Sequence, residues 1–440
     1  MKNKFDSLIK YFVPMFLLLV ILFSRSFIGI YIFGYRIGEY LVVFGLVISC
    51  FLPFLKKYFI KSIPKNLYYL NLMMVASFFV ILVINQSSLF NTYIFKSSSY
   101  IWTISYIYVG AYFFDIFKFK EKFILFLQIL LPVLYLLQTT YLYKLTVIYP
   151  LVDSSEDLLL NFFINYSDKY EIYKGTDLLI FFAILTYIIN RSNFTQYNKI
   201  LYFSGISSLF IPLFMVRSRA AYFSIMLFIF YELFQLLKTI KLDIKLMLSI
   251  LLIIFLMFNL SSANLTDKDF TSFDVSSSIN DLSKVRNTDL DGSIISYRDG
   301  RLYSSDGNFN WRLQIWQDVF KDSINNNNFF FGYGYENKIP AMEIEGRSGS
   351  DGKNENVHNF IVNVYARGGI IQCAIYLSFI ISIFSFSRNL NYPRKFSTLL
   401  FVSLLASLFD ASMENAHFPV FLYLFIGYFI AYNKYYNESV

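Results

Sequence analysis

The sequence predicts an all-α, polytopic integral membrane protein with about twelve transmembrane helices. The chain of 440 residues is 56% hydrophobic and only 15% charged, a composition outside the range of soluble globular proteins. Apolar runs of about 17–23 residues, long enough for a bilayer-spanning helix, recur along the chain. Short basic segments follow alternate runs, as expected for connections on the cytoplasmic side.

Taken in order, the predicted spans begin near residues 11, 38, 67, 99, 123, 177, 199, 219, 245, 369, 396 and 416. Basic connections such as KKYFIKSIPK, NRSNFTQYNK and KTIKLDIK are expected in the cytoplasm because positive charge favours that face. Both termini are then inside. The intervening loops face outward, and they include an acidic, aromatic loop at 143–177 and a long polar one at roughly 261–357.

The predicted organisation has three parts. Residues 1–260 hold spans one to nine, 261–357 form a large outward-facing loop with short amphipathic helices, and 358–440 hold spans ten to twelve. The net charge of +8 is explained by membrane orientation, so no nucleic-acid partner is expected. Cys50 and Cys373 lie in apolar runs, where neither a disulfide nor a metal site is expected.

The segment PLFMVRSRAAYFSIM places Arg217 and Arg219 in an outward turn between two spans. Ser218 is expected to cap the helix that begins at RAAYFSIML. The free N–H groups, the positive end of the helix dipole and Arg219 would then converge on one anion site. In the alternative interpretation, both arginines reach out to lipid phosphates. This stretch alone does not decide between the two.

A second arginine stands in NWRLQIWQDVFKD. On a helical wheel of about 100° per residue, Arg312 falls in the middle of the apolar arc. That arc contains Leu313, Ile315, Trp316, Val319 and Phe320, and the polar arc contains Gln314, Gln317, Asp318 and Lys321. A guanidinium on the apolar face needs an anionic partner to offset its desolvation. We therefore predict an anion-binding role for Arg312, provided that the helix includes it.

The segment NENVHNFIVNVYARGG closes the large loop and contains His358, one of two histidines in the chain. A neutral imidazole at the outer interface is the best available proton acceptor near neutral pH, although a lone histidine is more often structural. The other histidine, His417, is expected on the same side, with Glu414 nearby. Two weaker patterns are DLD at 289–291, which is common by chance, and RDGR at 298–301, which is expected to form a solvated turn.

These segments, in this order, resemble the O-antigen ligase and polymerase family of bacterial envelope enzymes. RSRAAY resembles the family's Ser/Thr-Arg-Ala/Gly stretch, and WRLQIWQDVFKD with FFFGYGYEN resembles its helix before a Phe-Gly-x-Gly turn. VHNFIVNVYARGGII resembles the His-Asn element, and MENAHFPVFLYLFIGY is similar to the last span. One departure is Gln372, which stands where that element usually has a second glycine after Gly369. The first 200 residues contribute only topology.

The resemblance implies a GT-C-like fold that transfers a whole glycan from undecaprenyl diphosphate to an acceptor hydroxyl. In that reaction Arg219 and Arg312 would bind the diphosphate and stabilise its developing charge. His358 would accept the proton of the acceptor hydroxyl. No cofactor is expected, and no metal, because two arginines would neutralise the leaving group. Further substrate contacts are expected from Arg217, Arg301, Asn359 and Glu414.

Several functional alternatives remain open at this stage. An O-antigen ligase acting on lipid A-core is favoured over a repeat-unit polymerase because the large loop directly precedes the His element. A flippase or other transporter would instead place cations along a cavity within the bilayer. A GT-C transferase that uses polyprenyl-phosphate sugars usually has an acidic residue in its first outer loop, and SRSFIGIYIFGYRIG contains none.

The ligase interpretation fixes the expected location and partners. We expect a multi-pass protein of the bacterial inner membrane with its active site on the periplasmic side. Its partners would be the undecaprenyl diphosphate-linked donor, a lipid A-core or carrier-linked glycan acceptor, and membrane lipids. The sequence leaves open whether a flippase and a chain-length regulator work with it.

Overall fold

The computed structural model describes, apart from single residues, the ranges 25–88, 91–117, 158–168, 175–177, 179–180, 182–183, 194–217, 219–238, 243–262, 295–344, 355–388 and 393–438. Helices dominate these ranges, and the sheets found in them are two short antiparallel hairpins. This agrees with the expected all-α membrane protein.

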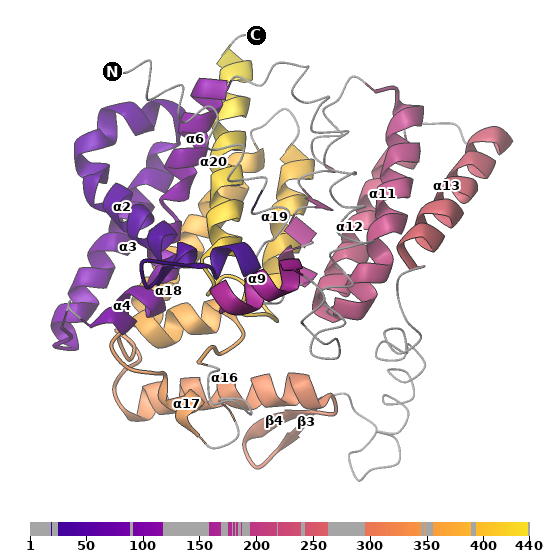
Figure 1. The fold of residues 1–440 in the computed structure, drawn as a ribbon. Coiled ribbons are helices and arrows are strands. Elements are labelled where there is room, and N and C mark those ends of the chain that lie inside the picture. The colour runs from indigo at the N-terminus through magenta and orange to yellow at the C-terminus, as the bar shows by residue number, and fades with distance from the viewer. Residues whose placement is uncertain are drawn as a thin grey trace.

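Helices from both halves of the chain form one bundle (Figure 1). Its members are α2 (Ile37–Ser62), α3 (Lys65–Ile84), α6 (Tyr106–Phe117), α18 (Phe360–Arg388), α19 (Pro393–Ser407) and α20 (His417–Glu438). α20 packs closely along α6 because Gly110 and Gly427 lie at the contact, where a Cβ on either residue would overlap the backbone of the other helix. Small residues permit such close approach between helices in membranes.

A second group of helices stands beside this bundle in Figure 1. It consists of α11 (Gln196–Arg217), α12 (Arg219–Leu237) and α13 (Ile244–Ser262). α11 packs against both of the others, and α12 also contacts α19. Most of α13 is exposed apolar surface, as expected for a helix that faces lipid.

Four described helices are long and apolar enough to cross a membrane, namely α2, α3, α13 and α18, and shorter apolar segments lie in α12, α19 and α20. Helices begin at or near the spans expected at 38, 67, 199, 219, 245, 396 and 416. The span expected at 99 is divided between α5 (Ser99–Thr103) and α6. The spans expected at 11 and 123 lie outside the described residues, as does most of the one at 177, so the count of twelve stays a prediction.

α18 is interrupted near the expected start of the tenth span. Gly369 has φ +66° and ψ −171°, a backbone conformation that only glycine adopts readily. A Cβ there would overlap the backbone of Phe330, and one on Gly332 would overlap that of Arg367. Close packing at this point is therefore kept although Gln372 replaces the usual second glycine.

Gln372 itself is fully buried. Its carbonyl oxygen accepts hydrogen bonds from the Tyr100 hydroxyl at 2.5 Å and the Tyr335 hydroxyl at 2.8 Å, and its amide donates to Ser77 Oγ at 2.9 Å. The residue thus ties α3, α5 and the segment before α17 (Pro340–Glu343) to α18. A glycine at this position would remove that connection.

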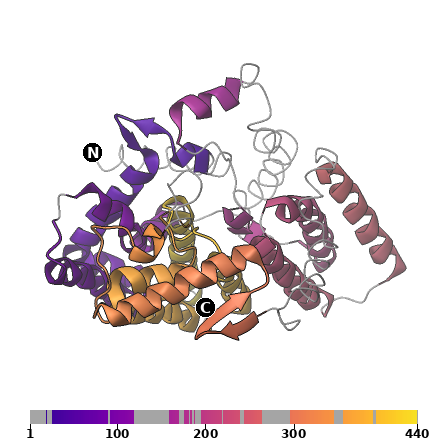
Figure 2. The ribbon, with the colours of Figure 1, turned by 90° about the horizontal axis from the view of Figure 1, so that it is seen from below.

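The described residues between α13 and α18 form small elements, which lie across one end of the helices (Figure 1 and Figure 2). They are β3 (Ile295–Arg298), β4 (Arg301–Ser304), α16 (Gly307–Asn325) and α17. Asp299 and Gly300 link the two strands with φ of +50° and +76°, as a tight two-residue hairpin turn requires. The expected domain boundaries at 260 and 357 stay a prediction.

α16 contains Arg312 because it begins well before that residue, at Gly307, where Asp306 Oδ1 accepts the Phe309 N–H at 2.7 Å. One expectation for its faces was wrong. Asp318, expected on the polar face, is buried and forms ion pairs with Arg301 and Arg347. The cause is the β3–β4 hairpin, which covers that face. Phe320, expected on the apolar face, is 44% exposed and packs against the Tyr365 ring, with centroids 4.7 Å apart.

The N-terminal half also contains small elements. They are β1 (Tyr31–Ile32), β2 (Tyr35–Arg36), α4 (Thr92–Ser97) and α9 (Leu158–Tyr166). An isolated bridge pairs Ile30 with Ser167, whose hydroxyl also donates to the Ser26 carbonyl at 2.8 Å. These contacts fix the end of α9, and with it Asp168, beside the β1–β2 hairpin.

Candidate functional site

Two segments that are distant in sequence meet on one face of α16. The ring centroids of Trp311 and His358 are 5.2 Å apart, and Trp316 Nε1 donates to the Val357 carbonyl at 2.7 Å. We refer to Trp311, Arg312, Trp316, Val357 and His358 as the α16 surface. Its two predicted site residues, Arg312 and His358, come from segments that were singled out separately in the sequence.

The Arg312 guanidinium keeps hydrogen-bonding capacity. Its Nε is buried and has no hydrogen-bond partner among the residues that the structure describes. Burial lowers the pKa of Arg312, while the nearby carboxylates of Asp410 and Asp306 oppose that shift. The attraction of Asp410, together with the Phe309–Phe409 ring contact at 6.1 Å, places this end of α16 beside the connection between α19 and α20.

His358 occupies an unusual backbone position just before α18. Its φ is +54°, which costs energy for a residue other than glycine and recurs at functional sites. The next residue, Asn359, caps α18, because its Oδ1 accepts the N–H groups of Ile361 at 3.0 Å and Val362 at 3.1 Å. Substrate contact by Asn359 stays a prediction, and its side-chain Oδ1 already serves as the helix cap.

The remaining predicted site residues are placed differently. Arg217 ends α11 and Arg219 begins α12, but their side chains and Ser218 lie outside the described residues, so their roles stay predictions. Arg301, on β4, is paired with Asp318. Glu414 lies in a separate cavity, close to the start of α20.

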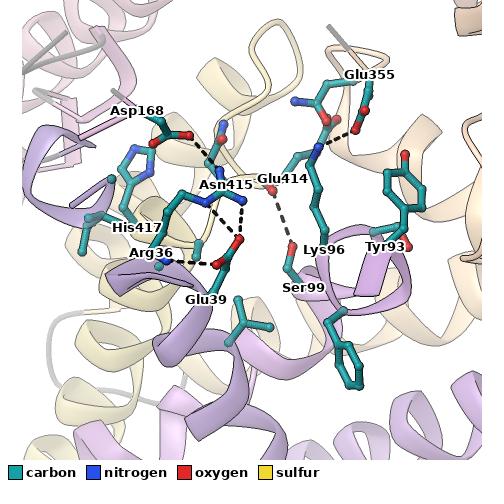
Figure 3. A pocket seen from close by; sticks show the side chains of 18 of the residues that line it. Arg36, Glu39, Tyr93, Lys96, Ser99, Asp168, Glu355, Glu414, Asn415 and His417 are labelled. Atoms are coloured by element: carbon teal, nitrogen blue, oxygen red, sulfur yellow. Dashed lines mark hydrogen bonds and ion pairs between the residues drawn. The ribbon is translucent and has the colours of Figure 1, made fainter. Parts of the chain in front are cut away.

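That cavity has a volume of about 280 Å³ and a lining rich in charged groups (Figure 3). β2, the start of α2, α4, the first part of α18 and the α19–α20 connection enclose it. We call it the charged pocket, and its main charged groups are Arg36, Glu39, Lys96, Asp168, Glu355 and Arg367.

Ion pairs join the elements around the charged pocket (Figure 3). Arg36 contacts Glu39 at 2.6 Å and Asp168 at 2.9 Å. Lys96 contacts Glu355 at 2.5 Å. Burial raises the pKa of Glu355, but its contacts with Lys96 and, to a smaller extent, Lys338 outweigh that effect, so the pKa lies below its usual value. These pairs join β2 to the start of α2 and to the end of α9, and α4 to the segment before α18.

Contacts of two further side chains, Arg367 and His417, support the walls. The buried Arg367 donates to the carbonyls of Gly334 and Asn337 and to the Tyr93 hydroxyl at 3.1 Å, with its guanidinium 5.5 Å from the Tyr93 ring centroid. His417 Nε2 lies 2.8 Å from Asp177 Oδ1, and both side chains are buried. Arg367 therefore fixes Tyr93 against the pocket, and Asp177 fixes the ring of His417.

One short segment joins the two regions. Glu355 and Asn356 line the charged pocket, and Val357 and His358 contact α16. Because a chain advances at most about 3.6 Å per residue, the backbones of Asn356 and His358 are within roughly 7 Å of each other. The charged pocket and the α16 surface are thus neighbours.

Residues 205–377 match the family model described as O-antigen ligase. The chain carries a domain of the O-antigen ligase family. A comparison of the whole chain with curated protein sequences finds no match. The O-antigen ligase domain runs from within α11 into α18, and it indicates a membrane glycosyltransferase of the ligase or polymerase type.

The O-antigen ligase domain divides the site in an informative way. Every residue of the α16 surface lies within 205–377, as do Arg217, Arg219, Arg301 and Asn359. The charged pocket combines Glu355 and Arg367 from the domain with Arg36, Lys96 and Asp168 from outside it. Sequence reasoning predicted Glu414 as a substrate contact but missed the other charged groups of this pocket. A local signal for two of them is the close spacing of Arg36 and Glu39, which form an i,i+3 ion pair.

Proposed function

We propose that the protein transfers a glycan en bloc from an undecaprenyl diphosphate carrier to an acceptor hydroxyl at the outer face of the bacterial inner membrane. The observation that carries this proposal is the α16 surface. There His358 packs against Trp311, and the next residue on the helix, Arg312, has a buried Nε without a hydrogen-bond partner among the described residues, inside a domain of the O-antigen ligase family.

Arg312 suits the leaving group of this reaction. A lipid diphosphate is strongly anionic, and a planar guanidinium can donate two parallel hydrogen bonds to phosphate oxygens. Partial burial strengthens the attraction because water screens it less. In the proposal Arg312 stabilises the charge that develops on the diphosphate as its bond to the sugar breaks. Arg219 adds a second cation, and Arg217 supports it.

His358 suits the acceptor side. In the proposed step the acceptor hydroxyl oxygen bonds to the anomeric carbon, the diphosphate oxygen leaves with the bonding electrons, and His358 takes the hydroxyl proton. The Trp311 ring and the hydrogen bond from Trp316 to Val357 limit how far this histidine can move. The imidazole is then positioned before the acceptor arrives.

The proposed acceptor is lipid A-core, which makes the protein an O-antigen ligase. A polymerase would use the same donor and the same leaving group but would accept a carrier-linked glycan. Arg312 and His358 serve both reactions equally, so the acceptor must be identified by experiment. Arg301 and Glu414 are proposed as contacts to the sugars. Metal independence is part of the proposal.

The test is glycan transfer by the purified protein in liposomes, in EDTA and without ATP. An undecaprenyl diphosphate-linked oligosaccharide is the donor, and lipid A-core and a carrier-linked glycan are supplied as separate acceptors. We expect transfer by the wild type and its loss in Arg312→Ala and His358→Ala. Arg298→Ala removes an exposed arginine of the same region and is expected to keep full activity.

The possible results separate the alternatives. Glycan on lipid A-core supports the ligase, and elongated carrier-linked glycan supports the polymerase. Loss of transfer in EDTA that added Mg²⁺ restores would overturn metal independence. If neither acceptor is modified and labelled donor crosses the bilayer instead, the protein is a transporter and the proposal is wrong.

A further inference from the structure

The charged pocket has a chemistry unlike that of the α16 surface. Its described lining contains four Lys or Arg side chains, Arg25, Arg36, Lys96 and Arg367, and four carboxylates, Glu39, Asp168, Glu355 and Glu414. Ion pairs already join Arg36 to Glu39 and Asp168, and Lys96 to Glu355. A diphosphate favours an excess of cations, so this balanced lining is a poor site for the carrier's head group.

A balanced lining of this kind suits a neutral ligand with many hydroxyl groups. Each carboxylate has oxygen lone pairs beyond those used in its ion pair, and each guanidinium or ammonium has further N–H donors. A hydroxyl group can donate to the first and accept from the second. Amide groups at Asn356, Asn363 and Asn415 add both functions. Among the substrates of the proposed reaction, the sugars are the ones that carry many hydroxyl groups.

Aromatic side chains and volume agree with a sugar. Tyr35 and Tyr93 line the pocket, and the apolar C–H face of a pyranose can lie against such rings. Tyr93 is held in place by Arg367. A cavity of about 280 Å³ is at the small end of ligand sites, so it suits one or two sugar units and leaves the rest of the glycan outside.

The location decides which sugar this is. Asn356, in the pocket lining, is two residues from His358. In the proposed function His358 accepts the proton of the acceptor hydroxyl. Because the His358 backbone is within roughly 7 Å of that of Asn356, a sugar held in the pocket lies beside the proposed proton acceptor, and the donor diphosphate is assigned to the Arg312 side.

We propose that the charged pocket is the acceptor subsite, which binds the sugar unit carrying the reacting hydroxyl. The inference rests on the proposed function for the identity of the ligand. It assigns acceptor choice to a pocket with walls from outside the O-antigen ligase domain: β2, α4 and the end of α9. His417, fixed by Asp177, and Glu414 form its wall at the start of α20.

The experiment measures kinetics and binding separately. Glu39→Gln and Asp168→Asn keep side-chain size and remove the charge that pairs with Arg36. We expect each to raise the KM for the acceptor about tenfold, with little change in kcat or in the KM for the donor. Asn363→Leu removes an amide from the lining without breaking an ion pair that the structure describes, and it should have the same effect. Glu343→Gln, at an exposed position of α17, is the matched control and should behave as the wild type.

Binding is measured without any transfer. The probe is the acceptor oligosaccharide freed of its lipid, titrated into the protein in detergent without donor. The wild type and Arg312→Ala should bind it alike, and Glu39→Gln and Asn363→Leu should bind it at least tenfold more weakly. All variants are compared by size-exclusion profile and thermal unfolding, so that a misfolded variant is recognised.

The outcomes keep this inference apart from the proposed function. If wild type binds the oligosaccharide, Glu39→Gln and Asn363→Leu bind it more weakly, and nothing is transferred, the pocket stands as a sugar-binding site and the enzymatic proposal fails. If transfer occurs while Asn363→Leu and Glu39→Gln leave the acceptor KM unchanged, the proposed function stands and the pocket assignment is wrong. A rise in the donor KM alone would assign the pocket to the donor and overturn the inference.

Discussion

The α16 surface and the charged pocket are adjacent, and both contain arginine, but they use it differently. On the α16 surface Arg312 retains a buried Nε without a hydrogen-bond partner in the described part of the chain. In the pocket Arg36 is held between two carboxylates, at 2.6 Å from Glu39 and 2.9 Å from Asp168. A cation with unused donors attracts an anion, whereas a paired cation mainly offers fixed hydrogen-bonding geometry. The same residue type therefore indicates different ligands in the two regions.

The largest expected effect is at Arg312. Replacing it by Ala should lower kcat for transfer by about 10²–10³, the cost of removing one preorganised donor to developing negative charge. Arg312→Lys keeps the charge but loses the planar pair of donors, so it should retain intermediate activity. Initial rates at saturating acceptor measure both. If only the KM for the acceptor rises, Arg312 acts like the arginines of the charged pocket. The proposed difference between the two regions would then be wrong.

A second prediction concerns the hydrogen bonds that hold the pocket's supporting helices. Gln372→Leu leaves the buried hydroxyls of Tyr100 and Tyr335 without their acceptor, at a cost of about 1–3 kcal/mol for each. Thermal unfolding in detergent should show the loss. Tyr335→Phe in the same background should recover part of it. If the double variant is as unstable as the sum of the single ones, the Tyr335–Gln372 bond contributes nothing.

A smaller effect is expected where the two regions join. Trp316→Phe keeps an aromatic ring but removes the donor to the Val357 carbonyl, next to His358. One such bond is worth about 1 kcal/mol, so kcat should fall about fivefold while the acceptor KM hardly changes. Trp316 also contacts Phe309, with ring centroids 6.1 Å apart, and Phe preserves that packing. An unchanged kcat would mean that the function of His358 does not depend on the hydrogen bond between Trp316 and Val357.

The smallest effect is a dependence on pH. Glu355 has a pKa below its usual value because its contacts with Lys96 and Lys338 outweigh the effect of its burial. Since the folded-state pKa is the lower one, the ion pair stabilises the fold above the unfolded pKa of about 4.3, and this contribution is lost as pH falls through the folded value. Unfolding of wild type should become easier between pH 5 and pH 3 by more than unfolding of Glu355→Gln. Equal slopes for the two proteins would contradict the assignment.

Local patterns in the sequence predicted much of the α16 surface. Periodicity placed Arg312 on a helix, and the rarity of histidine drew attention to His358. The buried Asp318 was not predictable, because a wheel describes one helix and takes no account of a hairpin that covers its polar side. The ion pairs of Asp168 and Glu355 were not predictable either, because each joins two segments that no sequence pattern relates to each other. Hydropathy predicted where helices begin, as at α2 and α13, but it does not predict which loops contact one another in the fold.

The glycine at position 369 also has a consequence for where the membrane surface lies. Hydropathy alone makes α18 one apolar span of 28 residues, from Phe360 to Ser387, which is longer than a bilayer requires. Because Gly369 ends the first part, only residues 370–388 continue as an uninterrupted helix, and these extend roughly 28 Å at 1.5 Å per residue. That length matches the hydrocarbon thickness of about 30 Å. If residues 370–388 form the span, the segment just before the glycine, which includes Arg367, is expected near the lipid head groups, the level at which a lipid-linked substrate carries its diphosphate.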